Sequence, residues 1–259
     1  MLINQVLIYS ENHNVNNSKG TVIITHGIAL HSIYYRKMAE LLNEAGFSVV
    51  LYDVRGHGKS QGKRGDIKSI YQFTSDLYEL VEQTKKVYDG PIFLLGHSMG
   101  GIITKVYATL YDNFDGTIIM SSPTSAQRLG LVSLLPSFLF GSYKLKTDFT
   151  DTRLSHFPPS DNVDPYALKH FTFRLIIQTL KVGTKHIEKC ILDYKKPVLI
   201  LHGSEDKLVS SQMSKHFFES IKYNDKKLVI IEGGYHNLNY DTVTEKVVEE
   251  IVSWLNNQI

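Results

Sequence analysis

The chain is poor in several features that each mark a class of protein. It has one cysteine, Cys190, among 259 residues, so no disulfide can form within the chain, whereas disulfide frameworks are typical of small secreted domains. No apolar run reaches the roughly 18 residues needed to cross a bilayer, and Met1–Gln5 does not begin a secretory signal. We therefore expect a cytoplasmic protein in which Cys190 is a small buried side chain.

An excess of charge of one sign is also absent. Lys and Arg number 28 and Asp and Glu 26, a formal net charge of +2, which does not suggest a surface that binds nucleic acid. The common metal-site patterns, H-E-x-x-H and clustered Cys/His, do not occur. The dinucleotide fingerprint G-x-G-x-x-G is missing as well. The sequence predicts no nucleic-acid partner, no metal and no cofactor.

What the chain does have is a hydrophobic fraction of 42%, enough for a sizeable core. Short apolar runs alternate with segments of helical period, which predicts a mostly parallel sheet flanked by helices. The predicted strands are residues 6–9, 21–25, 47–52, 91–95, 116–120, 197–201 and 227–231, with a polar loop at 11–19. The predicted helices are residues 34–45, 69–88, 99–111, 210–221 and 243–255.

This alternation stops over residues 122–195, which predicts a cap inserted between two parts of one core, residues 1–121 and 196–259. The cap is expected to end in an amphipathic helix over about residues 165–182. Its apolar stretch 129–140 has two interpretations. It is either a lid that docks on lipid, giving contact with a membrane or micelle, or a cap helix packed on the core.

The motif Gly96-His97-Ser98-Met99-Gly100 lies between a predicted strand and a predicted helix. A serine in such a turn is lifted above the edge of the sheet, and the flanking glycines leave room for the sharp bend. The N-terminus of the following helix then faces whatever the serine attacks. Because G-x-S-x-G occurs by chance in about one in ten chains of this length, its strand–turn–helix context carries the inference that Ser98 is a nucleophile.

A serine nucleophile needs a histidine base, and the base needs a carboxylate that orients it. His236 follows the last predicted strand, and Asp206 follows the strand at 197–201. The carboxyl ends of parallel strands meet at one edge of the sheet, so we expect Ser98, Asp206 and His236 to meet there. Their order along the chain is that of the α/β-hydrolases. Glu205 remains the alternative acid.

Two backbone N–H groups are expected to stabilise the oxyanion that serine attack creates. One belongs to Met99, which follows the nucleophile at the start of the helix. The other is expected from the loop after the strand at 21–25. Gly27 lets the backbone approach there, and Ile28 supplies the N–H.

The other histidines are expected to have no part in catalysis. Structural positions beside glycine or in a tight turn are expected for His26, His57, His97 and His202. Solvated positions are expected for His13, His156, His170, His186 and His216. His31 is expected either at the mouth of the pocket or in solvent. Asp53, another residue after a strand, is expected to cap a turn or to pair with Arg55.

Several motifs together resemble the serine α/β-hydrolases of the monoacylglycerol lipase and lysophospholipase group, which includes serine aminopeptidases. The matching segments are Thr25–Gly27 with His31, Ser32 and Tyr35, Asp53–Ser60, Gly62, Arg64–Gly65, Gly96–Gly101, His202–Asp206 and Glu232–His236. The resemblance implies the α/β-hydrolase fold with an inserted cap and abbreviated first strands. It also implies Ser98 as nucleophile, Asp206 as acid, His236 as base, and the Ile28 and Met99 amides as the oxyanion hole.

The function that follows is a serine carboxylic-ester hydrolase working through an acyl-enzyme. The implied substrates are monoacylglycerols, lysophospholipids or similar single-chain lipid esters. A small-ester carboxylesterase, a thioesterase and a serine peptidase remain open as alternatives, and a non-catalytic binding protein on the same fold is a remote one. Carboxylates that could hold the amine of a peptide substrate are Asp148, Asp151, Asp161 and Asp164.

Overall fold

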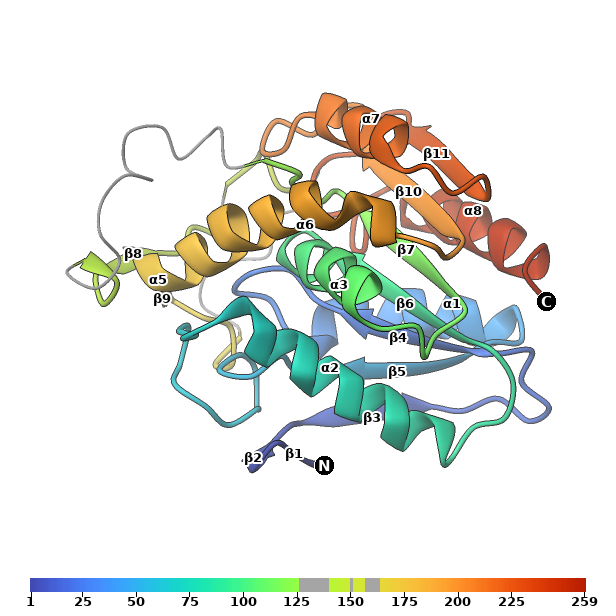
Figure 1. The fold of residues 1–259 in the computed structure, drawn as a ribbon, viewed down its shortest axis with the longest axis horizontal. Helices are drawn as coiled ribbons and strands as arrows, with labels where there is room; N and C mark the ends of the chain where they lie inside the picture. The colour runs from blue at the N-terminus through green and yellow to red at the C-terminus, as the bar shows by residue number, and fades with distance from the viewer. Residues whose placement is uncertain (126–139, 150, 157–163) are drawn as a thin grey trace.

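A seven-stranded sheet runs through the middle of the molecule (Figure 1). The structure is a computed structural model and describes residues 1–125, 140–149, 151–156 and 164–259. The strands of this sheet are β3 (Ser10–His13), β4 (Thr21–Thr25), β5 (Ser48–Tyr52), β6 (Ile92–His97), β7 (Gly116–Met120), β10 (Val198–Gly203) and β11 (Lys226–Ile231). They lie in the order β11-β10-β7-β6-β4-β5-β3.

All neighbouring strands of this sheet are parallel except β3 and β5, which are antiparallel. Strands β4 to β7 and β10 are buried along their whole length. Continuous apolar runs are expected of parallel strands because helices cover both faces of the sheet. The predicted fold class is therefore confirmed.

The helices that pack on the sheet are α1 (Arg36–Glu44), α2 (Ile70–Lys85), α3 (Met99–Leu110), α7 (Ser211–Ser220) and α8 (Thr244–Asn256). Successive strand residues face opposite layers. Ile23 and Leu94 pack with α2 and α3, whereas Val22 and Leu95 pack with α1 and α8. Among the described residues, no helix is long and apolar enough to span a bilayer.

One prediction for the N-terminal part is wrong, and another is confirmed in part. Residues 10–13 form strand β3, although residues 11–19 are expected to be a loop. Of the strand expected at 6–9, Val6–Leu7 form β2, which pairs with β1 (Leu2–Ile3) in a small hairpin. The sequence Ser-Glu-Asn-His has no apolar alternation. Its pairing with β5 comes from backbone hydrogen bonds along an edge of the sheet, and polarity patterns do not report these.

The segment between residues 122 and 195 also differs from expectation. Strands β8 (Lys144–Lys146) and β9 (His170–Thr172) pair antiparallel, and one long helix follows. This helix comprises α5 (Phe173–Ile176), a π-helical stretch η3 (Ile177–Gly183) and α6 (Thr184–Cys190). The helix predicted at 165–182 therefore begins and ends about eight residues later. Cys190 is half-buried rather than buried, and most of the apolar stretch 129–140 lies outside the described residues.

A buried carboxylate explains where this long helix begins. The Thr172 side chain accepts the N–H of Leu175 and so caps the helix. Its hydroxyl also donates to Asp66 Oδ1 at 2.7 Å, and Arg174 Nε donates to the same oxygen at 2.9 Å. Burial alone would raise the pKa of Asp66, but the bonds from Arg174 and Thr172 outweigh it and hold the pKa well below its usual range. Asp66 thus anchors the helix start to the core.

Lys105, in the middle of α3, is completely buried. Its Nζ donates to the carbonyl of Pro123 at 2.7 Å and lies 4.9 Å from the centre of the Phe217 ring. None of the ion pairs among the described residues includes Lys105. Burial lowers its pKa to about 7, because the charged form loses its hydration.

Replacing Lys105 should flatten part of the pH dependence of stability. An unfolded lysine has a pKa of about 10.4, so between pH 7 and 10 the unfolded chain holds a proton that the folded chain lacks. The free energy of unfolding of the wild type therefore rises with pH in this window relative to Lys105→Met. Urea unfolding of both proteins across this range measures the difference.

The matched control is Lys86→Met, which alters an exposed lysine on the end of α2. Its stability difference from the wild type should stay constant with pH. A Lys105→Met difference that is equally constant would show that Lys105 keeps its proton in the fold.

Candidate active site

Ser98 occupies the sharp turn between β6 and α3, directly at the carboxyl end of the strand. Its backbone has φ +52° and ψ −113°, a conformation that costs an ordinary residue on the order of 1–3 kcal/mol. The N–H of Ser98 donates to the carbonyl of Met120 at 2.9 Å, and Ser122 Oγ donates to the carbonyl of Ser98 at 3.0 Å. Both partners belong to β7 or the turn after it, so the neighbouring strand holds the strained residue.

Two glycines allow α3 to pack this closely against the sheet. A Cβ on Gly100 would lie 2.0 Å from the carbonyl oxygen of Thr25, at the end of β4. A Cβ on Gly96 would lie 2.5 Å from the carbonyl oxygen of Gly100. Glycine is therefore required at both positions because a side chain would clash, and not because of an unusual φ angle. The G-x-S-x-G pattern thus reflects how closely α3 packs against β6 and β4.

The structure brings Ser98, His236 and Asp206 together in one hydrogen-bonded row. Ser98 Oγ donates to His236 Nε2 at 3.0 Å, and His236 Nδ1–H donates to Asp206 Oδ2 at 2.8 Å. His236 and Asp206 are buried, and Ser98 is 9% exposed. Ser98 directly follows β6, and Asp206 and His236 lie in the loops after β10 and β11, at the same edge of the sheet. Distances of this kind allow a proton to pass from the serine to the histidine.

Asp206 is held as an ionised acceptor. Its Oδ1 accepts the backbone N–H groups of Leu208 and Val209, each at 2.8 Å. His202 Nε2 lies 3.1 Å from Oδ2. Burial would raise the pKa of Asp206, but the charge of His236 and the hydrogen bonds from His202 and His236 outweigh it and hold the pKa well below its usual range. The side chain of the alternative acid, Glu205, is exposed, and among the described residues His236 Nδ1 pairs with Asp206 and not with Glu205.

A second hydrogen-bonded row ends at the backbone carbonyl of His236. The N–H of Gly27 donates to Tyr35 Oη at 3.0 Å, and Tyr35 donates to His97 Nδ1 at 2.6 Å. His97 Nε2–H then donates to the carbonyl of His236 at 3.1 Å. Burial, followed by the nearby His236, lowers the pKa of His97 to about 3, so His97 is neutral and keeps this direction of donation. Tyr35 was not identified from the residues alone; its place among the family motifs was the one available signal.

The histidines expected in structural positions are all buried, namely His26, His57, His97 and His202. His26 accepts the N–H of Val54, and burial lowers its pKa to about 4.

Four other histidines differ from expectation because they have partners within the chain. His31 is neither at a pocket mouth nor in solvent: it is buried, and its Nε2 lies 2.6 Å from Asp164 Oδ2. Among those expected in solvent, His186 lies between Tyr71 Oη and Thr109 Oγ1, 2.9 Å from each. His156 Nδ1 lies 2.5 Å from Asp241 Oδ1, and His13 is half-buried beside Glu11. The partners of His31, His156 and His186 are more than 70 positions away, which local sequence does not reveal.

Asp53 caps a turn, which is the first of the two roles expected for it. Its Oδ1 accepts the N–H of Ser32 at 2.8 Å, and its Oδ2 accepts the N–H of Lys59 at 2.7 Å. Arg55 pairs instead with Asp76 at 2.6 Å. The carboxylate of Asp53 is therefore fully occupied by the backbone of two loops.

Two cavities with different linings meet at Ser98. One, of about 270 Å³, has Met99, Ile102 and Leu180 among its mostly apolar walls. The other, of about 320 Å³, is also lined mostly by apolar surface, but its wall includes charged side chains of both signs, Lys146, Asp148, Asp151 and Arg153. Ile28, Ser98, Phe171 and Leu208 line both. Ile28 and Met99, the residues expected to supply oxyanion donors, therefore lie beside the serine, and no group of three or more potential metal ligands occurs among the described residues.

The fold places the chain among the α/β-hydrolases. A family model described as "Serine aminopeptidase, S33" matches residues 16–243, and the chain belongs to this family. The resemblance inferred from the sequence motifs is thereby confirmed.

Relatives and solved structures with similar chains carry lipase names. The chain is 31% identical to "Monoglyceride lipase" of Rattus norvegicus over 93% of this chain and 84% of that protein. The crystal structure of Paleococcus ferrophilus monoacylglycerol lipase is 27% identical, with a TM-score of 0.83 over 98% of this chain and all of that chain (100%). A soluble variant of monoglyceride lipase from Saccharomyces cerevisiae, in complex with a substrate analog, has a TM-score of 0.86 over 99% of this chain and 93% of that one. At 21% identity, the last comparison concerns the fold alone.

Proposed function

We propose that this protein is a serine carboxylic-ester hydrolase that cleaves monoacylglycerols or similar single-chain lipid esters through an acyl-enzyme. Ser98 is the nucleophile, His236 the general base and acid, and Asp206 the residue that orients the base. The N–H groups of Ile28 and Met99 form the oxyanion hole. No metal or cofactor takes part in these steps.

The reaction is proposed to use the hydrogen-bonded row from Ser98 through His236 to Asp206. His236 Nε2 takes the proton of Ser98 Oγ as the oxygen attacks the ester carbonyl. Asp206 stabilises the resulting imidazolium, and each oxyanion donor is worth about 3 kcal/mol of barrier. Collapse of the intermediate expels the alcohol, which receives the proton from His236. Water, deprotonated by His236, then attacks the acyl-enzyme and releases the carboxylic acid.

The observation that carries the substrate class is the contrast between the two cavities at Ser98. The apolar cavity of about 270 Å³ suits an acyl chain. The other cavity is less apolar, and its two cations and two carboxylates can accept hydrogen bonds from, or donate them to, the hydroxyl groups of an alcohol. A single-chain lipid ester has these two ends on either side of its carbonyl. The names of the relatives, which are monoglyceride lipases and a monoacylglycerol lipase, support the same class.

We also propose that residues 122–195 are the cap that selects the substrate. Phe171, just before the long helix, lines both cavities, and Ile176 and Leu180 of that helix line the apolar one. Lys146 and Arg153 from the same segment line the other one. Contact of this cap with a lipid surface belongs to the proposal, although the apolar stretch 129–140 that suggested it lies mostly outside the described residues.

A peptidase is less well supported by the carboxylates available. Asp151 is paired with Arg153, with its Oδ1 at 2.9 Å from Arg153 Nε. Asp164 is paired with His31. Asp161 lies outside the described residues. Asp151 is thus engaged by an arginine and Asp164 by a histidine of the chain itself. Asp148 lines the cavity of about 320 Å³ together with Arg153 and keeps the peptidase as an alternative.

A substrate panel tests the proposed reaction and its acyl preference. We expect kcat/KM of p-nitrophenyl esters to rise from acetyl to octanoyl, because each methylene buried in the apolar cavity contributes about 0.8 kcal/mol. We also expect turnover of 1-monooctanoylglycerol, and alanyl p-nitroanilide should release product only at the rate of Ser98→Ala. An optimum at the acetyl ester with no turnover of monoacylglycerol would contradict a lipid ester hydrolase. Faster cleavage of the anilide would indicate a peptidase.

The choice of acid is tested by Asp206→Asn beside Glu205→Gln. The asparagine cannot hold the His236 tautomer or stabilise the imidazolium, so kcat on the best ester of the panel should fall by about 10⁴-fold. Glu205→Gln removes the adjacent carboxylate and should change kcat by less than about twofold, as for a surface substitution. The reverse pattern would transfer the orienting role to Glu205.

A further inference from the structure

Three successive residues of the loop that carries His236 are held by hydrogen bonds from other parts of the chain. The N–H of Asn237 donates to the carbonyl of Leu154 at 2.7 Å, and the N–H of Tyr235 donates to Asp241 Oδ2 at 3.4 Å. The carbonyl of His236 is the end of the second hydrogen-bonded row. The backbone on both sides of the proposed base is therefore fixed from outside.

The loop itself gives the base little support on the side of β11. It begins with Glu232, Gly233 and Gly234. Gly233 has φ +74°, and a Cβ at this position would have no atom within 4 Å. Glycine has more backbone freedom than any other residue. We therefore expect the position of His236 to depend on contacts with the rest of the chain.

Residues 151–156 of the proposed cap supply the first of these contacts and support the second. Asp151 Oδ1 accepts both the backbone N–H and the Nε–H of Arg153 at 2.9 Å, and the N–H of Leu154 donates to the carbonyl of Asp151 at 3.0 Å. The segment is thus a compact turn. Leu154 lines the cavity of about 320 Å³ together with His236, so this turn touches both the substrate cavity and the loop of the base.

His156 supports the second contact through Asp241. Its Nδ1 lies 2.5 Å from Asp241 Oδ1, and because an ionised carboxylate only accepts, Nδ1–H is the donor. The backbone N–H of His156 donates to the same oxygen at 3.3 Å. The side chain of Asp241 is buried, whereas that of His156 is 36% exposed. The carbonyl of Asp241 accepts from Thr244 at the start of α8, which anchors Asp241 to the core.

The rings of His156 and Tyr235 also pack against each other. Their centres are 4.5 Å apart and their planes meet at 66°, an edge-to-face arrangement. His156 thus reaches the residue before the base in two ways, through Asp241 and by ring contact. Substitutions separate the two, because asparagine keeps an N–H donor near the position of Nδ1 and phenylalanine keeps a ring.

We propose that His156 is a positioning residue for the base of the reaction. Together with Leu154 and Asp241 it fixes the backbone around His236, so that the base is aligned with Ser98 while this turn of the cap lies on the loop. The inference rests on the proposed function and adds a requirement to it, namely that cap contact completes the site. His156 touches none of the reacting atoms and acts on the rate of the chemical steps.

The first test measures kcat and KM of His156→Phe and His156→Asn on p-nitrophenyl octanoate. A misplacement of about 1 Å can cost roughly 100-fold in rate. His156→Phe keeps the ring and loses the donor, so its kcat should fall about tenfold while KM stays within about twofold. His156→Asn keeps a donor and should hold kcat within about threefold. An unchanged kcat of His156→Phe, a change confined to KM, or an equal loss in both variants would overturn the inference.

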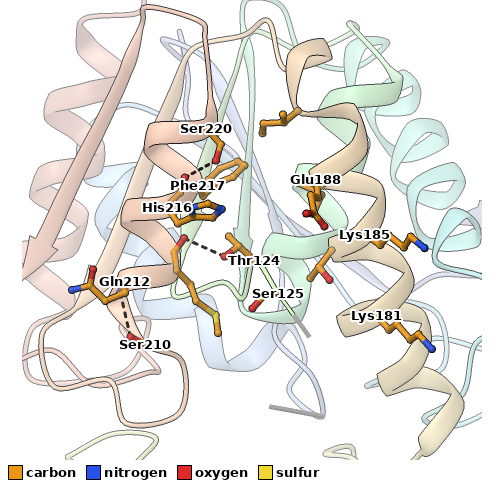
Figure 2. A pocket seen from close by; sticks show the side chains of 14 residues that line it. Thr124, Ser125, Lys181, Lys185, Glu188, Ser210, Gln212, His216, Phe217 and Ser220 are labelled. Atoms are coloured by element: carbon orange, nitrogen blue, oxygen red, sulfur yellow. Dashed lines mark hydrogen bonds between the residues drawn. The ribbon is translucent and has the colours of Figure 1, made fainter. Parts of the chain in front are cut away.

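His216→Phe is the matched control. His216 is another exposed histidine, and it lines a groove of about 690 Å³ between α7 and α6 (Figure 2). The described residues that line this groove include none of the three proposed for catalysis. Its kcat should stay within about twofold of the wild type. A loss as large as that of His156→Phe would also overturn the inference, because it would follow from replacing any exposed histidine.

Asp241→Asn is a second test that does not depend on the folding of His156→Phe. One of the two atoms that now accept, from His156 and from the N–H of Tyr235, becomes a donor. The kcat of Asp241→Asn should therefore also fall about tenfold. In the double variant the loss should stay near that of either single variant, since both residues act through one hydrogen bond. Losses that multiply would contradict the proposed role.

Labelling with a fluorophosphonate separates this inference from the proposed function. The probe reports activation of Ser98 without an ester substrate, and we expect His156→Phe to be labelled about tenfold more slowly than the wild type. A wild type that neither reacts with the probe nor hydrolyses esters would refute the proposed function. An active wild type that is labelled no faster than His156→Phe would refute the positioning role alone.

Discussion

The strained backbone at Ser98 is the constraint on which the rest of the site depends. A non-glycine residue with φ +52° persists only where its surroundings hold it. Here β7 accepts its N–H, Ser122 donates to its carbonyl, and the absence of side chains at Gly96 and Gly100 lets α3 press against the ends of β6 and β4. The same close packing brings the N-terminus of α3 to the sheet edge, where the other functional residues lie.

That edge gathers side chains from strands far apart in the sequence. The loops after β10 and β11 supply Asp206 and His236, and the loop after β4 supplies Ile28. The row from Gly27 through Tyr35 and His97 to the carbonyl of His236 joins the proposed oxyanion loop to the proposed base. The same row of hydrogen bonds positions both groups, so we expect a substitution that displaces one of them to displace the other.

Much of this arrangement could be predicted from the sequence, because each residue proposed for the chemistry follows a strand that contains an apolar run, although β11 before His236 is only half-buried. The strand ends before Ser98 and Asp206 are visible as runs of apolar residues, and parallel topology then places them together. What could not be predicted depends on long-range or backbone partners. Strand β3 pairs through its backbone, and His31 pairs with a carboxylate 133 positions away. The long helix begins at Thr172 because Asp66 and Arg174 fix it there.

The central claim is that the turn between β6 and α3 makes Ser98 an activated nucleophile. The most direct measurement is labelling with a fluorophosphonate probe, followed by mass spectrometry of the digested protein. We expect a single adduct on the peptide that carries Ser98, no adduct in Ser98→Ala, and labelling slowed by orders of magnitude in His236→Ala. An adduct on another residue, or equal labelling of Ser98→Ala, would contradict it.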